Sequence, residues 1–163
     1  MTKASRAKIK VSELNQVSIA VHDLEKSMEH YQNTLGIGSW EIFDADSSTL
    51  SDMTYHGRSV QHRFRAAFAI VGPMQLELVQ PLEGDSIFSD FLREHGEGVN
   101  HLGSVRVHSL DEAIDILEKE GFPCLQSGRF AGGGYACMDT VKTLGVIIEV
   151  LERPEGMPAS GRR

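Results

Sequence analysis

Two hydrophobic periods follow each other in the stretch LNQVSIAVHDLEKSMEHYQNTLGI, residues 14–37. Up to residue 21, apolar residues alternate with polar or small ones, which is typical of a strand. From residue 24, apolar residues recur every three or four positions, which predicts an amphipathic helix. The helical stripe consists of Leu24, Met28, Tyr31 and Leu35. Asp23 has the position of an N-cap and Gly36 that of a C-cap, so the stretch predicts a strand that leads directly into a helix.

The same arrangement returns in VNHLGSVRVHSLDEAIDILEKEGF, residues 99–122. Here an apolar strand leads into a helix with the apolar stripe Leu110, Ile114 and Leu117. Ser109 and Glu112 have the spacing of a capping box, and Gly121 follows the last helical turn. The chain therefore contains an internal repeat, which has to be recognised before any other assignment is made.

Three strand-like segments follow each of the two helices. They are 39–45, 62–71 and 74–81 in the first half and 123–130, 133–140 and 145–154 in the second. The polar segment of residues 46–61 is interpreted as a loop. Each half is thus β-α-β-β-β. Because one helix covers only one face of such a half, we expect the halves to combine, with the helices outside and the sheet curved around a shared hollow.

The predicted fold class is therefore α+β, with two tandem β-α-β-β-β modules that form a curved sheet around this hollow. The expected parts are a flexible N-terminal arm (1–10), a single domain (11–153) made of modules at about 11–82 and 98–153 with the link 83–97, and a flexible tail (154–163). The tail is rich in Pro, Gly and small polar residues, as flexible chain ends often are.

The chain has 163 residues, of which 40% are hydrophobic and 24% are charged, the balance of a soluble globular domain. The net charge of −7 argues against nucleic acid as a partner. No apolar run approaches the ~20 residues that span a bilayer, and residues 1–10 lack the apolar centre of a secretory signal. We therefore expect a cytoplasmic protein without a membrane partner. Cys124 and Cys137 have neither a metal-site spacing nor a disulfide framework, and both are interpreted as small buried hydrophobes.

Because successive side chains of a strand point to opposite faces, the predicted strands show which residues share a face. Three of these strands contain candidate functional residues. Gln16, Ser18 and Ala20 share a face on which one amide precedes two small residues. Glu77 and Glu149 each lie among aliphatic residues in the last strand of a module. A glutamate usually faces water, but two glutamates at equivalent places of a repeat indicate a shared function.

The repeat also pairs Gln16 with His101, which lies near the start of the second module. If the modules meet about an approximate two-fold axis, the amide and carboxylate of the first module face the imidazole and carboxylate of the second. The predicted metal ligands are Gln16, Glu77, His101 and Glu149. This mostly oxygen set suits a divalent cation such as Zn²⁺, Ni²⁺, Co²⁺, Mn²⁺ or Mg²⁺. Four protein ligands leave positions open for substrate oxygens in an octahedral shell, as a Lewis-acid catalyst requires.

Three segments carry a resemblance to a known family: QVSIAVHDLEKSMEHYQNTLGI, MQLELVQPLEGDSIFSDFLREHGEGVNHLG and GVIIEVLE. Together they resemble the vicinal oxygen chelate superfamily, which includes glyoxalase I, methylmalonyl-CoA epimerases, extradiol dioxygenases and bleomycin-resistance proteins. The resemblance extends over about residues 14–154, and its middle segment is most similar to methylmalonyl-CoA epimerases. By this resemblance, Glu77, His101 and Glu149 fall on metal positions of the family, and a homodimer is expected.

The chain departs from the epimerase pattern at two places. Epimerases usually have His where this chain has Gln16, whereas glyoxalase I often has Gln. The stretch HLGSVRVHSL also has one residue more between His101 and the following turn than its counterpart in the first module. We expect a bulge or a register change there, which leaves open whether Val105, Arg106 or Val107 faces the hollow.

The site and the resemblance predict a metal-dependent isomerase, epimerase or lyase that acts on a carbon acid next to a carbonyl or thioester. Glu149 or Glu77 would carry the proton. A CoA thioester, as in methylmalonyl-CoA epimerisation, is the first expected substrate. A glutathione adduct, as for lactoylglutathione lyase, is an alternative that Gln16 favours, and a non-catalytic binding protein of the bleomycin-resistance type is the third. An iron-dependent ring-cleaving dioxygenase would use two His and one carboxylate as ligands. This chain has Gln16 in place of one of these histidines, which argues against that class.

Other histidines and arginines receive less specific interpretations. The remaining histidines, His62 among them, fall in turns, loops, segment ends or off the helical stripe, where solvent exposure or local hydrogen bonding is expected rather than metal binding. Positive charge gathers between Arg58 and Arg65, either as a solvated loop or as a patch for an anionic substrate, and the sequence leaves both open.

Overall fold

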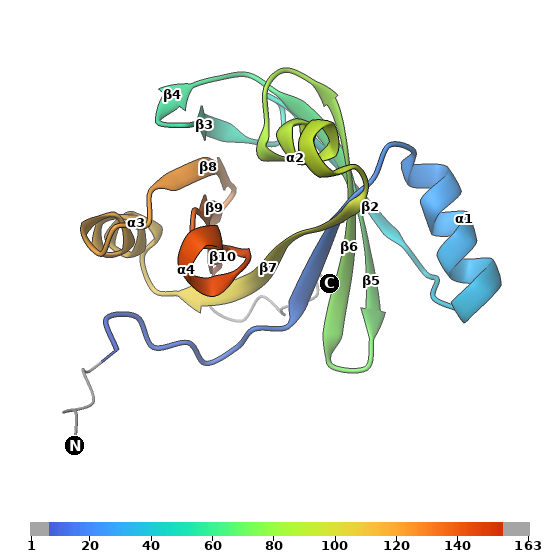
Figure 1. Cartoon of the computed structure of the whole chain (residues 1–163), viewed down its shortest axis with the longest axis horizontal. Coiled ribbons are helices and arrows are strands. Elements are labelled where there is room, and N and C mark those ends of the chain that lie inside the picture. The colour runs from blue at the N-terminus through green and yellow to red at the C-terminus, as the bar shows by residue number, and fades with distance from the viewer. Residues whose placement is uncertain (1–6, 155–163) are drawn as a thin grey trace.

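The computed structural model describes residues 7–154. Its strands form one ten-stranded sheet in the order β2-β5-β6-β1-β7-β10-β9-β8-β3-β4, which curls around the inside of the molecule (Figure 1). The strands are β1 (Gln16–Ala20), β2 (Glu41–Ala45), β3 (Ser51–Tyr55), β4 (Arg58–Ser59), β5 (Arg63–Val71), β6 (Met74–Glu83), β7 (Gly98–Val107), β8 (Cys124–Phe130), β9 (Gly133–Met138) and β10 (Ile147–Glu152). The helices are α1 (Leu24–Leu35), α2 (Ile87–His95), α3 (Leu110–Lys119) and α4 (Val141–Leu144). The expected arm and tail include residues 1–6 and 155–163, which lie outside the described residues.

Two modules make up this sheet, as the internal repeat predicts. In the first, β1 runs parallel to β6, and β5 and β2 follow toward one edge. In the second, β7 runs parallel to β10, and β9 and β8 follow toward the other edge. β1 and β7 pair antiparallel and join the modules at the centre of the sheet. The α+β fold of two β-α-β-β-β modules is therefore confirmed.

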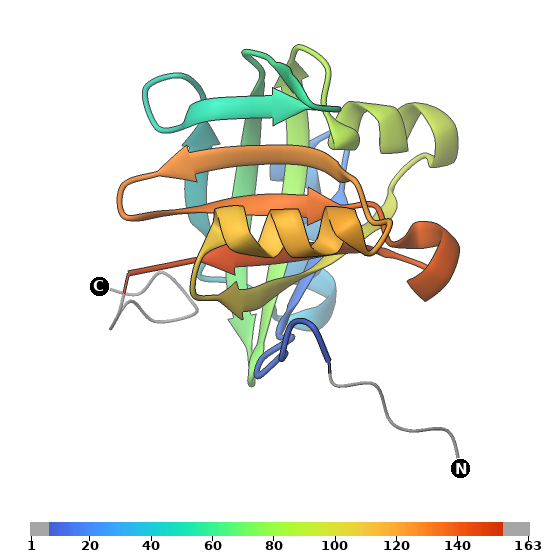
Figure 2. The ribbon, with the colours of Figure 1, turned by 90° about the vertical axis from the view of Figure 1, so that its left-hand side faces the viewer.

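One helix packs on the outer face of each module (Figures 1 and 2). α1 packs on β5 and β6, and α3 packs on β9 and β10. At the start of α1, Asp23 Oδ1 accepts a hydrogen bond from Lys26 N at 3.0 Å, and Gly36 ends the helix in the left-handed region with a φ of 68°. Ser109 Oγ accepts a hydrogen bond from Glu112 N at 3.3 Å at the start of α3. No helix in the described part of the chain is long and apolar enough to cross a membrane.

The interpretation of residues 46–61 as a loop is wrong. This segment contains β3 and the short β4, and β3 pairs antiparallel with β8 of the second module. Leu50, Met53 and Tyr55 are buried because they pack inside the curled sheet. The polar residues between them hide this pattern in the sequence, and the partner strand belongs to the other module. A segment of the first half therefore extends the sheet of the second.

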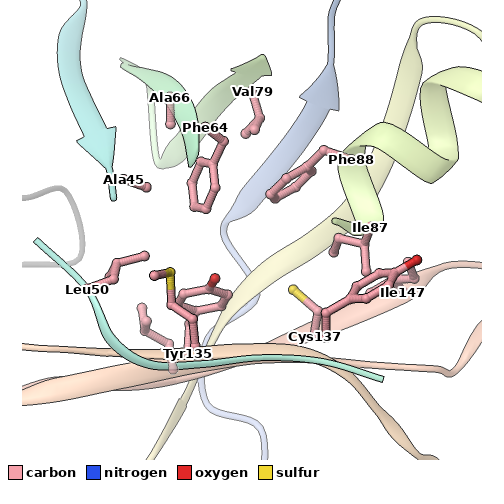
Figure 3. Close-up of a cluster of buried hydrophobic side chains, with 13 residues drawn as sticks. Ala45, Leu50, Phe64, Ala66, Val79, Ile87, Phe88, Tyr135, Cys137 and Ile147 are labelled. Carbon is pink, nitrogen blue, oxygen red and sulfur yellow. The ribbon is translucent and has the colours of Figure 1, made fainter. Parts of the chain in front are cut away.

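A hydrophobic cluster drawn from both modules fills part of the inside of the curled sheet (Figure 3). Phe64 and Val79 of the first module face Tyr135 and Cys137 of the second. Phe88 of α2 packs edge-on against Phe64, with 5.1 Å between the ring centroids. Burying a large apolar side chain contributes about 1.5–3 kcal/mol, so this shared core stabilises the contact between the modules.

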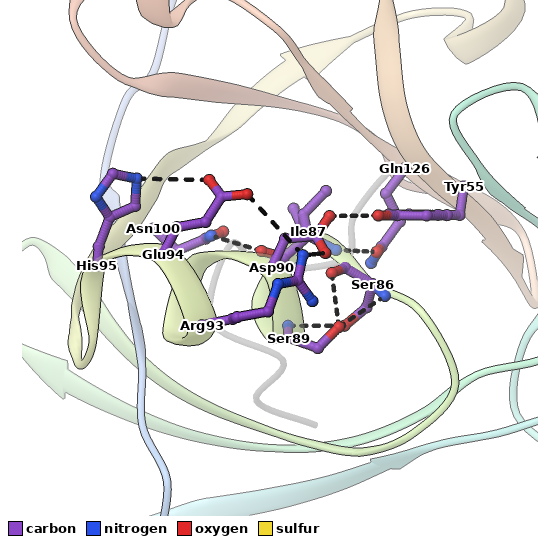
Figure 4. Close-up of polar contacts among 10 residues, drawn as sticks. All are labelled: Tyr55, Ser86, Ile87, Ser89, Asp90, Arg93, Glu94, His95, Asn100 and Gln126. Carbon is purple, nitrogen blue, oxygen red and sulfur yellow. Dashed lines mark hydrogen bonds and ion pairs between the residues drawn. The ribbon is translucent and has the colours of Figure 1, made fainter.

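α2 lies in the segment that links the modules and is tied to β3, β7 and β8 (Figure 4). The Ile87 amide donates a hydrogen bond to Gln126 Oε1 of β8 at 3.0 Å. The Tyr55 hydroxyl of β3 donates to the carboxylate of Asp90. Asn100 Nδ2 of β7 donates to Ile87 O at 3.4 Å. The N-terminus of α2 is therefore fixed next to the first residues of β7.

Candidate metal centre

The four predicted ligands lie on four neighbouring strands of the sheet. Across the sheet, their order is Glu77 on β6, Gln16 on β1, His101 on β7 and Glu149 on β10. All four residues are buried, with 1–9% of their surface exposed. The first strands of the modules pair at the centre, and each runs parallel to the last strand of its own module, so equivalent residues of the repeat come close together.

His101 lies between the two glutamates. Its Nε2 is 3.5 Å from Glu77 Oε2 and 3.5 Å from Glu149 Oε2. Burial lowers the pKa of His101 to about 3, so the imidazole is neutral and these contacts are not salt bridges. Burial also raises the pKa of both carboxyl groups, and the negative charge of Glu77 raises the pKa of Glu149 further. Two carboxyl groups and a neutral imidazole thus meet away from water.

Asn100 fixes the tautomer of His101. The Asn100 Nδ2 donates to Ile87 O, which turns the Asn100 Oδ1 toward His101 Nδ1 at 3.0 Å. Because an amide oxygen only accepts, Nδ1 carries the ring proton, and Nε2 keeps a free lone pair near the carboxylates. A ring N–H held by a neighbouring acceptor in this way is typical of metal-binding histidines.

Gln16 is oriented in a similar way. Its Nε2 donates to Gln75 Oε1 at 2.7 Å, while its Oε1 is buried without a hydrogen-bond partner among the described residues. Gly103 on β7 leaves room for this oxygen, because a Cβ at Gly103 would lie 2.2 Å from Gln16 Oε1 and 3.1 Å from Glu149 Oε1. The amide oxygen and the carboxylate therefore approach each other over a residue that has no side chain.

A bulge in β7 lies directly beside this point. The two β10 neighbours of Glu149 pair with Leu102 and Val105, so Gly103 and Ser104 both lie opposite Glu149. Ser104 has a φ of 61°, in the left-handed region. The bulge predicted for this strand is therefore confirmed. Val105 packs with the hydrophobic residues beneath α3, on the outer face of the sheet.

The donor set fits a divalent cation. Gln16 Oε1, Glu77 Oε2 and His101 Nε2 are all buried, and within residues 7–154 none of them has a hydrogen-bond partner. Buried polar atoms without partners are rare and costly, so three of them in one place indicate a site for a cation. A divalent ion would satisfy these atoms and balance the charge of two carboxylates. Gln16, Glu77, His101 and Glu149 are the residues that would hold it.

Three further residues at this site were not predicted from the sequence. Asn100 and Gln75 are the hydrogen-bond partners that orient two of the predicted ligands. Cys137, interpreted only as a small buried hydrophobe, also places its sulfur near His101 and Glu149. The pairing of β9 with β10 is what could have revealed Cys137. Cys137 lies opposite Glu149 in this pairing, so both side chains lie on the same face of the sheet.

Two other sequence expectations concern residues outside the four ligands. His62 is buried rather than exposed, and its Nδ1 lies 3.2 Å from a backbone oxygen of the Asp85 loop, a local contact of the expected kind. Arg63 forms a surface ion pair with Glu83 at 2.5 Å. Arg65 forms another with Asp44 at 2.6 Å. These ion pairs favour the solvated-surface interpretation of this positive segment over an anion-binding patch.

A comparison with known families covers most of the chain. Residues 15–138 match the family model of the Glyoxalase/Bleomycin resistance protein/Dioxygenase superfamily. The chain belongs to this superfamily. Its curled sheet of two β-α-β-β-β modules is the fold that the resemblance to the vicinal oxygen chelate superfamily implies.

Three similar proteins are epimerases by name. The chain is 34% identical over 107 residues to the mitochondrial methylmalonyl-CoA epimerase of Homo sapiens, a match that covers 66% of this chain and 53% of that protein. It is 31% identical over 119 residues to an ethylmalonyl-CoA/methylmalonyl-CoA epimerase of Cereibacter sphaeroides, covering 73% of this chain and 78% of the other. The crystal structure of methylmalonyl-CoA epimerase from Mycobacterium tuberculosis matches with a TM-score of 0.61 and 25% identity over 93% of this chain and 94% of that one. The chain spans about half the length of the mammalian relatives that it matches.

Proposed function

We propose that this superfamily member is a divalent-metal-dependent epimerase that acts on a carbon acid next to a thioester carbonyl, of the methylmalonyl-CoA type. The observation that carries the proposal is the pair of buried carboxyl groups, Glu77 and Glu149, each 3.5 Å from His101 Nε2. The similarity to epimerases that are named for acyl-CoA substrates supports the substrate class.

Epimerisation inverts one carbon by removing its proton and returning a proton to the opposite face. A carboxylate takes the proton from the carbon next to the thioester, and the C–H electron pair moves into the enolate. A carboxylic acid then returns a proton to the same carbon. Glu149 and Glu77 suit these two tasks because they come from different modules and both adjoin His101. Glu149 is the first candidate for the base, and Glu77 is the second.

The surroundings of the two glutamates favour this chemistry. Burial raises the pKa of both carboxyl groups, whereas a bound cation would lower it, so the two effects together set the strength of these groups as bases. When bound, a divalent metal would supply positive charge that stabilises the negative charge on an enolate oxygen. Gln16 offers an oxygen that adds no negative charge to the two carboxylates, which leaves more of that positive charge for the enolate.

The test combines metal analysis with solvent exchange. The purified chain is incubated in deuterated water with a panel of 2-substituted malonyl-CoA esters and glutathione hemithioacetals, and bound metal is measured on the same sample. The proposed function predicts inversion at the 2-carbon of a CoA ester, with deuterium incorporated there, in proportion to the bound metal. Metal-loaded protein that exchanges no CoA ester would overturn the proposal.

Gln16 supports a second candidate, the isomerisation of a glutathione hemithioacetal, because glyoxalase I often has Gln at this position. The chemistry is related, since a proton leaves one carbon and a proton is returned to its neighbour. Turnover of hemithioacetals without exchange into CoA esters would select this candidate. A third candidate, a binding protein of the bleomycin-resistance type, predicts saturable ligand binding without exchange or turnover.

A further inference from the structure

Cys137 lies in the same buried region as the four proposed ligands. It lies on β9 and pairs with Glu149 on β10, so both side chains leave the sheet on the same face. The residue is fully buried. In Figure 3, its sulfur points from β9 toward the inside of the curled sheet.

The sulfur is close enough to share an ion with two of the proposed ligands. The ligand atoms of His101, Cys137 and Glu149 all lie within 4.8 Å of one another. Sulfur and nitrogen donors of one tetrahedral zinc ion lie about 3.5 Å apart, given a Zn–S bond of about 2.3 Å and a Zn–N bond of about 2.0–2.1 Å. Side-chain rotations that shorten the longest of these separations by about an ångström would bring the three atoms to one ion.

The second cysteine of the chain provides a comparison. Cys124, on the neighbouring strand β8, packs with the hydrophobic residues beneath α3 on the outer face of the sheet. Its Sγ lies 3.7 Å from Gln126 O. Cys137 instead belongs to the hydrophobic cluster inside the curled sheet. One thiol thus faces the proposed centre, and the other faces away from it.

We propose that Cys137 is a sulfur ligand of the metal centre and makes it selective for thiophilic divalent ions, such as Zn²⁺, Co²⁺ or Cd²⁺, over Mg²⁺ and Mn²⁺. This inference rests on the metal centre of the proposed function. Thiolate is a soft ligand that Mg²⁺ and Mn²⁺ bind poorly, whereas the oxygen and nitrogen donors of the other four residues discriminate less. The sulfur binds as a thiolate, so its S–H bond breaks and the proton passes to the solvent as the metal binds.

The test titrates the metal-free full chain with Co²⁺ in the absence of oxygen. A cobalt–thiolate bond absorbs in the near ultraviolet by charge transfer from sulfur, which oxygen and nitrogen ligands do not provide. We expect this band in the wild-type protein and in the matched control Cys124→Ser, and its loss in Cys137→Ser, with folding checked by circular dichroism. Cys137→Ser should also bind Cd²⁺ at least about 10-fold more weakly, because the loss of even an outer-shell partner of a ligand costs that much, with unchanged affinity for Mn²⁺.

A second measurement needs no variant, because a serine at a fully buried position could prevent folding. X-ray absorption of the Zn²⁺-loaded wild-type protein should reveal one sulfur neighbour at about 2.3 Å from the metal. Bound cobalt without the band, zinc without a sulfur neighbour, or a band that is lost in Cys124→Ser would overturn the inference and leave the proposed function standing. A chain that binds no divalent ion would overturn both.

Discussion

The amide oxygen of Gln16 occupies space that any side chain at Gly103 would fill. The two residues pair across β1 and β7, the antiparallel strands that join the modules. A Cβ at Gly103 would lie 2.2 Å from Gln16 Oε1, far inside van der Waals contact. The junction between the modules thus provides the proposed centre with a neutral oxygen, and the position of that oxygen depends on a missing side chain on the opposite strand.

Gly103→Ala should therefore weaken metal binding by about 10–100-fold, because the Gln16 amide has to turn away and lose its hydrogen bond to Gln75. Gly98→Ala on the same strand is the matched control, since a Cβ there would meet Phe91 at 3.6 Å, an ordinary contact. Isothermal titration of both variants with Co²⁺ measures the difference. Equal affinities would show that Gln16 is not a ligand.

Asn100→Ala should weaken metal binding by a similar factor, about 10–100-fold, because His101 then loses the acceptor that fixes its ring orientation. Asn100→Asp keeps an acceptor for the His101 Nδ1–H and should recover much of the affinity. The same titration compares the two variants. If alanine binds metal as well as aspartate does, the contact with Asn100 has no role in positioning the imidazole.

The repeat explains which parts of the fold could be predicted from the sequence. The hydrophobic period changes from two to between three and four in each half, and the capping residues fix where α1 and α3 begin. Because the two halves repeat, their equivalent strands meet at the centre. The alternation of side chains along the strands, together with the equivalence of the two halves, could therefore select Gln16, Glu77, His101 and Glu149, which the fold places on four neighbouring strands. Their role as ligands stays a prediction.

Features without a counterpart in the repeat could not be found in this way. β3 depends on β8 as a partner, so its short apolar pattern in a polar segment does not reveal a strand. Cys137 lies at the site because it pairs with Glu149 across β9 and β10. The spacing of residues along the chain does not reveal this pairing. Asn100 can orient His101 because α2 holds its amide, and that contact depends on how α2 packs against β7.

The hydrogen bond from Tyr55 to Asp90 ties β3 to α2 and predicts a response to alkaline pH. Burial and this hydrogen bond raise the pKa of Tyr55 from 10.0 to about 12. The folded chain therefore holds the phenol proton more tightly than the unfolded chain does. The resulting stabilisation is complete below the unfolded pKa and is lost as the pH rises through the folded one. We expect the free energy of unfolding in urea to fall more steeply above pH 10 in the wild type than in Tyr55→Phe, and equal slopes would contradict this assignment.

A homodimer is the assembly that we expect. Within the described residues, β2 pairs on one side only, at the edge of the sheet, and its Ile42 is 48% exposed. Exposed strand edges promote association with another chain unless they are covered. Light scattering during gel filtration should give twice the mass of one chain at micromolar concentration, and the mass of a single chain would count against the dimer.

The substitution Glu149→Gln tests whether the chain is an enzyme or a binding protein. The substitution keeps the shape of the side chain and one oxygen for a metal, but an amide is no useful base, so turnover of the CoA ester should fall by about 10²–10⁴-fold. If Glu149 only holds the metal, activity should instead follow metal occupancy and recover when excess metal is added. Turnover and bound metal are therefore measured together on the same sample, with Glu77→Gln as the matched variant from the other module. Full metal with lost turnover supports Glu149 as the base, whereas full metal with wild-type turnover would falsify that role and make Glu77 the next candidate.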